Sequence, residues 1–153
     1  MMNKFALFLA TTCYSGYCPV APGTVGAFIA VVALWFLPAL STPVLGSVFI
    51  ASYFVGVWAS GIAEKAWGVD PGRVNWDEVA GMMITLLFLP KHWIIYAAGF
   101  LAFRFFDVLK PWPVNVMEKL PGGWGIMSDD VMAGIYSNIV LQILFRLLIK
   151  LPA

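Results

Sequence analysis

The chain has 153 residues, of which 61% are hydrophobic and 11% charged, and its formal net charge is +1. Soluble domains carry roughly 25% charged residues, whereas residues 5–63 of this chain contain no Asp, Glu, Lys or Arg. This composition excludes an ordinary soluble domain and predicts a single integral-membrane domain over residues 1–153. Without a basic stripe, the chain also lacks what a nucleic-acid partner would require.

Five apolar segments are predicted to be membrane helices, since crossing the hydrocarbon takes about 20 mostly apolar residues. They cover residues 24–40, 44–63, 79–89, 93–103 and 131–149. The third and fourth segments are short and are separated by Pro90, Lys91 and His92. One long kinked helix would place a proline, at a cost of about 3 kcal/mol, and a Lys–His pair in mid-membrane. We therefore expect a central hairpin of two short helices within an all-α, polytopic membrane bundle.

The hairpin determines which loops share a side of the membrane. It places the loops at residues 64–76 and 108–128 on the side where the first segment begins. Six basic residues then lie on that side and three on the other. The six are Lys4, Lys65, Arg73, Arg104, Lys110 and Lys119, and the three are Lys91, Arg146 and Lys150. This excess predicts that the side with six is cytoplasmic.

Five of the eight acidic residues lie where a loop meets an apolar segment, all on the predicted cytoplasmic side. They are Asp77, Glu78, Asp107, Asp129 and Asp130. Carboxylates at the edge of a low-dielectric region are costly unless they are paired or metal-bound, and Arg104 and Lys110 share their side. The pattern predicts a metal-assisted site for an anionic substrate, and oxygen ligands suit Mg²⁺. The single histidine, His92, is on the opposite side, which excludes a His-rich zinc site.

Each part of this pattern also has a purely structural explanation. Asp77-Glu78 and Asp129-Asp130 are each predicted to open a helix, where acidic side chains favourably meet the macrodipole, and Ser128 would be an ordinary N-cap. Arg104 and Asp107 are three residues apart and could simply form an ion pair on one helix face.

A phosphate-binding feature is predicted at the start of the first segment. Gly23 permits close approach of the backbone, Thr24 can cap the helix, and free N–H groups at a helix N-terminus bind anions. Small residues inside the segments are instead predicted to let helices pack closely. These are Gly56, Ser60, Gly81, Gly99 and Gly134. The glycines at residues 122–125 are expected to form a flexible loop.

Four sequence blocks carry a family resemblance. They read PVAPGTVG at 19–26, WDEVAGM at 76–82, FRFFDVLKPWP at 103–113 and GGWGIMSDDVMAG at 122–134. In this order they resemble the motifs of the phosphatidylglycerophosphatase A family, over about residues 15–135. Ala27 departs from the pattern, where a Ser is expected.

The resemblance implies a Mg²⁺-dependent lipid phosphatase of the bacterial inner membrane, surrounded by membrane lipids and acting at the cytoplasmic face. It would hydrolyse phosphatidylglycerophosphate to phosphatidylglycerol and inorganic phosphate, the last step of phosphatidylglycerol synthesis. The expected metal ligands are Asp77, Glu78, Asp129 and Asp130. The expected phosphate-binding residues are Gly23, Thr24, Arg104 and Lys110. Asp107 completes the expected catalytic set, either as a further ligand or by orienting the two cations. One carboxylate would act as general base or attack phosphorus, and both routes stay open.

Two other functions were weighed against a phosphatase. A small membrane transporter for a cation or organic anion also carries membrane carboxylates, but transporters usually place them near the midplane and often show internal repeats. A transferase acting on nucleotide-activated lipids usually has a spaced Asp-Gly…Asp…Asp pattern, which is absent from this sequence. The oligomeric state is left open.

Overall fold

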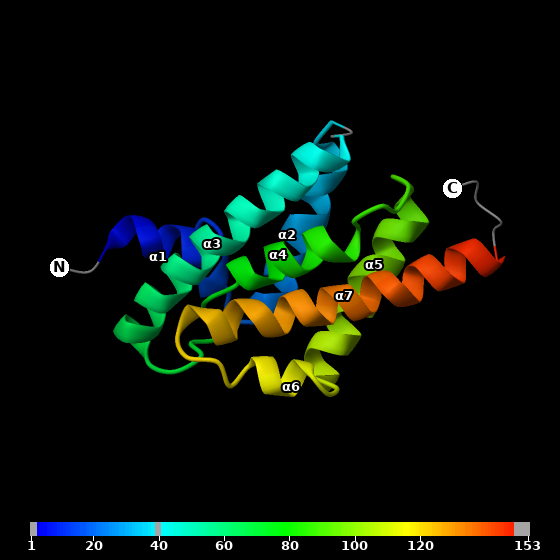
Figure 1. The fold of residues 1–153 in the computed structure, drawn as a ribbon. Coiled ribbons are helices and arrows are strands. Elements are labelled where there is room, and N and C mark those ends of the chain that lie inside the picture. Colours follow the sequence, from blue (N-terminus) through cyan, green and yellow to red (C-terminus); the bar gives the residue numbers. More distant parts are fainter. Residues whose placement is uncertain (1–2, 39–40, 149–153) are drawn as a thin grey trace.

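The fold is all-helical over residues 3–38 and 41–148, the parts of the chain that the computed structural model describes, which confirms the predicted class (Figure 1). Seven α-helices and one 3₁₀ turn, Ser15–Tyr17, lie in these ranges, which contain no strand. The helices are α1 (Lys4–Ala10), α2 (Pro22–Phe36), α3 (Thr42–Trp67), α4 (Trp76–Thr85), α5 (Trp93–Leu109), α6 (Val114–Met117) and α7 (Gly123–Leu148).

The helix starts follow from local sequence. α2 and α3 each have a proline in the first turn, where its missing N–H is not needed and its fixed φ favours the helix. α5 begins after His92, whose Nδ1 accepts a hydrogen bond from the backbone N–H of Ile94 at 3.3 Å. His92 is therefore an N-cap in a turn, as expected of a polar turn residue.

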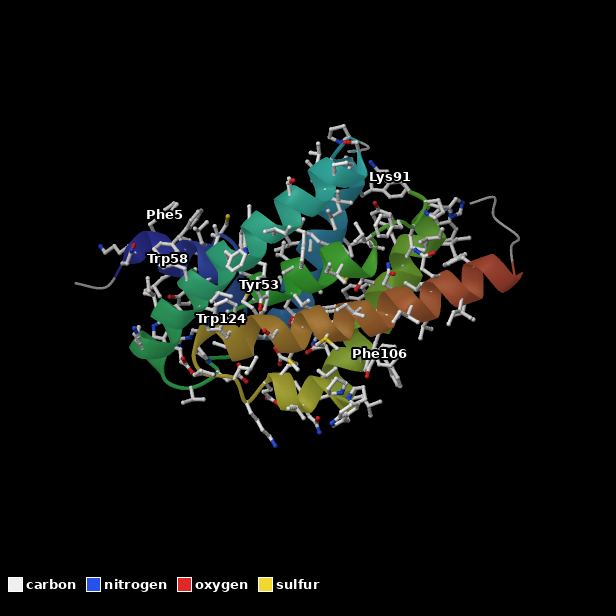
Figure 2. The ribbon with its side chains drawn as sticks, viewed as in Figure 1. Phe5, Tyr53, Trp58, Lys91, Phe106 and Trp124 are labelled. Carbon is white, nitrogen blue, oxygen red and sulfur yellow. The ribbon has the colours of Figure 1, made fainter. Side chains whose placement is uncertain are left out.

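The chain reverses between α4 and α5, as the hairpin prediction requires. Arg104, near the end of α5, lies 2.6 Å from Glu78 in the first turn of α4. At the opposite end of α5, Lys91 Nζ donates a hydrogen bond to the carbonyl oxygen of Leu37, beyond the end of α2. Figure 2 shows Lys91 and Phe106 at these two ends. A single kinked helix over residues 79–103 would not bring Glu78 and Arg104 together.

α4 lies between α3 and α7 and packs closely against α7 (Figure 1). A Cβ added to Gly134 would lie 2.5 Å from the carbonyl oxygen of Gly81, and one added to Gly81 would lie 2.9 Å from the carbonyl oxygen of Asp130. Both glycines therefore permit a helix contact that no larger residue allows, as their predicted packing role requires. The contact sets the first turn of α4 beside the acidic pair of α7.

One helix in the described part of the chain is long and apolar enough to cross a membrane, namely Pro43–Trp67. α2 is apolar but has 15 residues, and α4 has 10, about half the 20 that a crossing takes. The prediction of about five membrane helices is thus not confirmed and stays a prediction. The predicted segment ends at residues 40 and 149, and Lys150, fall outside the described residues.

The prediction of a loop over residues 108–128 is wrong in part. α6 lies within it, and α7 begins at Gly123, eight residues before the predicted start of the last segment. The reason is packing: a Cβ on Gly123 would lie 2.7 Å from the backbone nitrogen of Gly61 in α3. Nearby, the rings of Tyr53 and Trp124 are 6.0 Å apart (Figure 2). The glycines here allow α7 to approach α3 rather than making a loop flexible.

Candidate active site

Arg104 connects acidic residues of two helices. Its Nη1 donates to both carboxylate oxygens of Glu78, at 2.7 and 2.6 Å, and lies 2.7 Å from Asp107 Oδ2. Glu78 is 7% exposed, so this contact holds a nearly buried carboxylate against a guanidinium. The ion pair between Arg104 and Asp107, weighed as a structural alternative, is present, but it is part of a larger group.

Lys110 makes the second connection, from the end of α5 to α7. Its Nζ donates to Asp129 Oδ2 at 2.9 Å and lies 2.8 Å from Glu118 Oε1. Lys110 caps α5 in the left-handed conformation, with φ of 44°. The sequence analysis does not include Glu118, which lies beyond α6, among the site residues. Nothing in its loop sequence indicates the ion pair with Lys110.

Asp77 and Asp130 complete the carboxylate cluster, the name used below for Asp77, Glu78, Asp107, Asp129 and Asp130. In each acidic pair the first residue accepts a hydrogen bond from the backbone N–H of the second, at 3.0 Å for both Glu78 and Asp130. Asp130 is 4% exposed, and its Oδ2 is buried without a hydrogen-bond partner among the described residues. A buried carboxylate oxygen without a partner is costly.

The carboxylate cluster has more negative charge than its cations balance. It lies outside Pro43–Trp67, the candidate membrane span. Burial raises the pKa of Glu78 to about 7 although Arg104 opposes the rise, and burial raises the pKa of Asp129 to about 6 against the effect of Lys110. Burial, followed by the charges of Glu78 and Asp77, also raises the pKa of Asp130 well above its usual value. A further cation would reverse these effects.

Only one of the acidic pairs opens a helix. Asp77 and Glu78 lie in the first turn of α4, so the macrodipole explanation holds for them. It is wrong for Asp129 and Asp130, which lie inside α7 after its start at Gly123. Ser128 is not an N-cap; its hydroxyl is 2.8 Å from that of Tyr53. Helix capping therefore does not account for two buried acids in mid-helix.

The start of α2 reaches the carboxylate cluster. A Cβ on Gly23 would collide with Glu78 Oε1 and lie 3.3 Å from Arg104 Nη1, so a larger residue here would displace the Glu78 carboxylate. The N–H groups of Gly23 and Thr24 belong to the first helical turn, where they have no partner within the helix. The predicted capping role of Thr24 is wrong, because Ala21 is the N-cap and Thr24 lies inside α2.

Asn75 is a structural residue of the site that the sequence analysis missed. It is fully buried, and its Nδ2 donates to Ser15 Oγ at 2.9 Å and to the carbonyl oxygen of Pro22 at 3.2 Å. It thereby connects the turn after α1, the start of α2 and the start of α4. In the sequence, only the position of Asn75 directly before the block at residues 76–82 indicated that it belongs to the site.

The donors of the carboxylate cluster suit a hard cation, although no preformed cage is present. Among the described residues, no group of three or more His, Cys, Asp or Glu side chains is arranged to hold a metal ion. Mg²⁺ usually keeps several waters and uses one or two carboxylates together with substrate phosphates. The unpartnered Oδ2 of Asp130 and the oxygen-only donors therefore fit Mg²⁺ better than they fit a metal that needs a complete protein cage.

The arrangement can bind an anion and a cation next to each other. Arg104, Lys110 and the first turn of α2 supply positive charge and free donors, while the carboxylates supply hard oxygen ligands. Such juxtaposition is suited to phosphoryl chemistry, in which positioning and charge stabilisation do most of the work.

Comparison with known proteins gives an independent result. The family model described as Phosphatidylglycerophosphatase A matches residues 8–145. Proteins named Phosphatidylglycerophosphatase A from Escherichia coli and Haemophilus influenzae are 38% and 39% identical to the chain; each alignment covers 92% of this chain, and 83% and 88% of those proteins. A Bacteroides thetaiotaomicron protein named "Putative phosphatidylinositol-3-phosphatase" is 41% identical over 84% of this chain and 86% of its own length. No solved structure matches.

Proposed function

Because the chain belongs to the phosphatidylglycerophosphatase A family and is a phosphoric monoester hydrolase, we propose that it hydrolyses phosphatidylglycerophosphate to phosphatidylglycerol and inorganic phosphate. Two of the relatives carry that substrate in their names, and each of the two aligns with 92% of this chain. The family model spans every residue of the predicted site.

One observation supports this proposal most directly. Three helices bring five carboxylates together with two cations, through the contacts of Arg104 with Glu78 and of Lys110 with Asp129. A phosphate monoester needs cations to bind it, and the metal that assists its hydrolysis needs carboxylates. The carboxylate cluster with Arg104 and Lys110 provides both, beside the start of α4 and the end of α5.

We propose that Mg²⁺ binds in this cluster, held directly or through water by Asp77, Glu78, Asp129 and Asp130. When bound, Mg²⁺ would neutralise phosphate charge and make attack at phosphorus easier. The unpartnered oxygen of Asp130 supports a ligand role. Burial raises the pKa of Asp129 to about 6 even though Lys110 opposes the rise, and a further cation would favour the charged carboxylate.

The chain's own residues have distinct parts in this proposal. Arg104 and Lys110 bind phosphate oxygens and orient the ester, while the N–H groups of Gly23 and Thr24 hold a third oxygen at the positive end of α2. Asp107 keeps Arg104 in place. A carboxylate of the cluster then removes a proton from the attacking water or attacks phosphorus itself.

The proposed location is the bacterial inner membrane, crossed several times, with the carboxylate cluster at the cytoplasmic face. The hairpin supports this, since it puts Lys91 at one end of the bundle and the cluster at the other. Single cysteines replacing Lys91 and Lys119, labelled from outside in oriented vesicles, test the topology. Labelling at position 91 alone is expected; labelling of both positions from one side would refute it.

Phosphate release from purified protein in mixed micelles tests the activity. We expect release from phosphatidylglycerophosphate with Mg²⁺, loss of release in Asp77→Asn and Asp130→Asn, and little change in Asp70→Asn, an exposed acid outside the cluster. Phosphatidylinositol 3-phosphate serves as the competing substrate, because one relative bears that name. Preference for it, or near-normal turnover in both cluster variants, would contradict the proposal.

A further inference from the structure

An apolar groove lies between α2 and α5, with a volume of about 430 Å³. Its walls are the side chains of α2 from Phe28 to Phe36 and those of α5 from Trp93 to Leu101. Phe28 and Leu101 are 59% and 67% exposed, so the groove opens to the surroundings of the bundle. We call it the α2–α5 groove.

Two aromatic pairs cross the groove and define its ends. Phe28 and Phe100 meet edge to face at a centroid distance of 6.4 Å, and Trp35 and Tyr96 do so at 5.3 Å. Between the pairs, Ala97 is a small side chain among bulky neighbours. At a rise of about 1.5 Å per residue, the seven steps from Phe28 to Trp35 span roughly 10 Å.

On α2 and on α5 alike, the groove begins one helical turn from a residue of the proposed phosphate site. Thr24 and Phe28 are four residues apart on α2, and Phe100 and Arg104 are four residues apart on α5. Residues four apart lie on the same helix face. The groove therefore lies along the same faces of α2 and α5 as Thr24 and Arg104, at the end of the bundle at which Gly23, Glu78 and Arg104 meet.

We propose that the α2–α5 groove binds one acyl chain of the lipid whose phosphate occupies the carboxylate cluster. This rests on the proposed function and adds to it a second point of recognition, the hydrocarbon chain. In phosphatidylglycerophosphate the terminal phosphate is joined to the acyl chains through the headgroup glycerol and a phosphodiester, so a cationic site a short distance from an apolar groove matches its chemistry. A protein partner or a second copy of the chain would not need a groove on the same helix face as Arg104.

The proposal predicts that chain-length preference resides in the groove. Ala97→Trp fills it from α5 and Val32→Trp fills it from α2. For each, kcat/KM is measured on dioleoyl phosphatidylglycerophosphate and on the water-soluble dibutanoyl analogue. We expect the ratio of the long-chain to the short-chain value to fall at least about tenfold, the effect that one methylene has in an apolar pocket.

Ala51→Trp on α3 is the matched control, since it adds the same side chain to an exposed position outside the groove. Its ratio is expected to equal that of the unmodified protein. If the ratio of long-chain to short-chain kcat/KM is unchanged in both groove variants, bulk lipid occupies the groove and the proposal is overturned. An altered oligomeric state in these variants would place a second copy in the groove, which also overturns it. Failure of the unmodified protein to hydrolyse either substrate would instead contradict the proposed function.

Discussion

The contact between α4 and α7 allows a sharp test, because a single methyl group should disturb the site without touching it. A Cβ at Gly134 would lie 2.5 Å from the carbonyl oxygen of Gly81, whereas ordinary contacts begin at 3.4 Å. The obstacle is backbone, which cannot rotate away. In a close-packed interior the two helices must therefore separate by about 1 Å at this point.

The consequence of Gly134→Ala can be estimated for stability and for activity separately. Overpacking costs about 1–3 kcal/mol, offset by up to about 1 kcal/mol from the better helix propensity of Ala. The acidic pairs of α4 and α7 would move apart by the same distance as the helices. A misplacement of about 1 Å can lower the rate about 100-fold, so we expect a large loss of kcat with a small loss of stability.

The assay is phosphate release in the presence of Mg²⁺, measured together with thermal unfolding in detergent. Gly46→Ala is the control, because a Cβ at Gly46 in α3 would meet nothing within 4 Å; it should keep full activity. If Gly134→Ala unfolds near the normal temperature and keeps kcat within about twofold, the distance between the acidic pairs does not control catalysis, and the reasoning is refuted.

Four further predictions concern the site. Arg104→Lys should lower kcat/KM at least about tenfold, because a compact ammonium lacks the planar fork of donors with which a guanidinium binds phosphate oxygens; activity close to normal would show that charge alone suffices. Lys110→Met should also lower kcat/KM about tenfold or more, which is the usual contribution of a hydrogen bond to a charged group. The exposed Lys119→Met should leave kcat/KM unchanged, and equal effects of the two substitutions would contradict the proposed role of Lys110 in binding phosphate. Dialysis against EDTA should abolish phosphate release and added Mg²⁺ should restore it, so undiminished activity in EDTA would remove the metal from the mechanism. Asn75→Ala should lower the free energy of unfolding by about 1–3 kcal/mol through loss of its buried hydrogen bonds, and an unchanged unfolding temperature would argue against its connecting role.

The elements that could be predicted are those whose signal is local. The absence of charge over residues 5–63 indicated apolar helices, and Pro90 with its polar neighbours indicated the reversal between α4 and α5. That reversal brought Glu78 and Arg104 together, although 26 residues separate them. The grouping of acids on one side therefore followed from topology alone.

What could not be predicted depends on packing between distant segments. The start of α7 at Gly123 was missed because glycine before a helix indicates a loop, whereas here it permits contact with α3. The connecting role of Asn75 and the contact of Lys110 with Glu118 depend on loop positions that no periodicity encodes. The number of membrane crossings likewise depends on helix lengths and packing, which apolar composition alone does not give; α4, for example, has 10 residues.

The position of Arg104 between two acids has a consequence for the order of events during turnover. An incoming phosphate competes with Glu78 and Asp107 for the guanidinium of Arg104. When Arg104 turns to the phosphate, both carboxylates need another positive partner. A divalent ion arriving first would relieve that competition. Metal and lipid should then bind synergistically, each raising the affinity for the other by the same factor, as thermodynamic linkage requires.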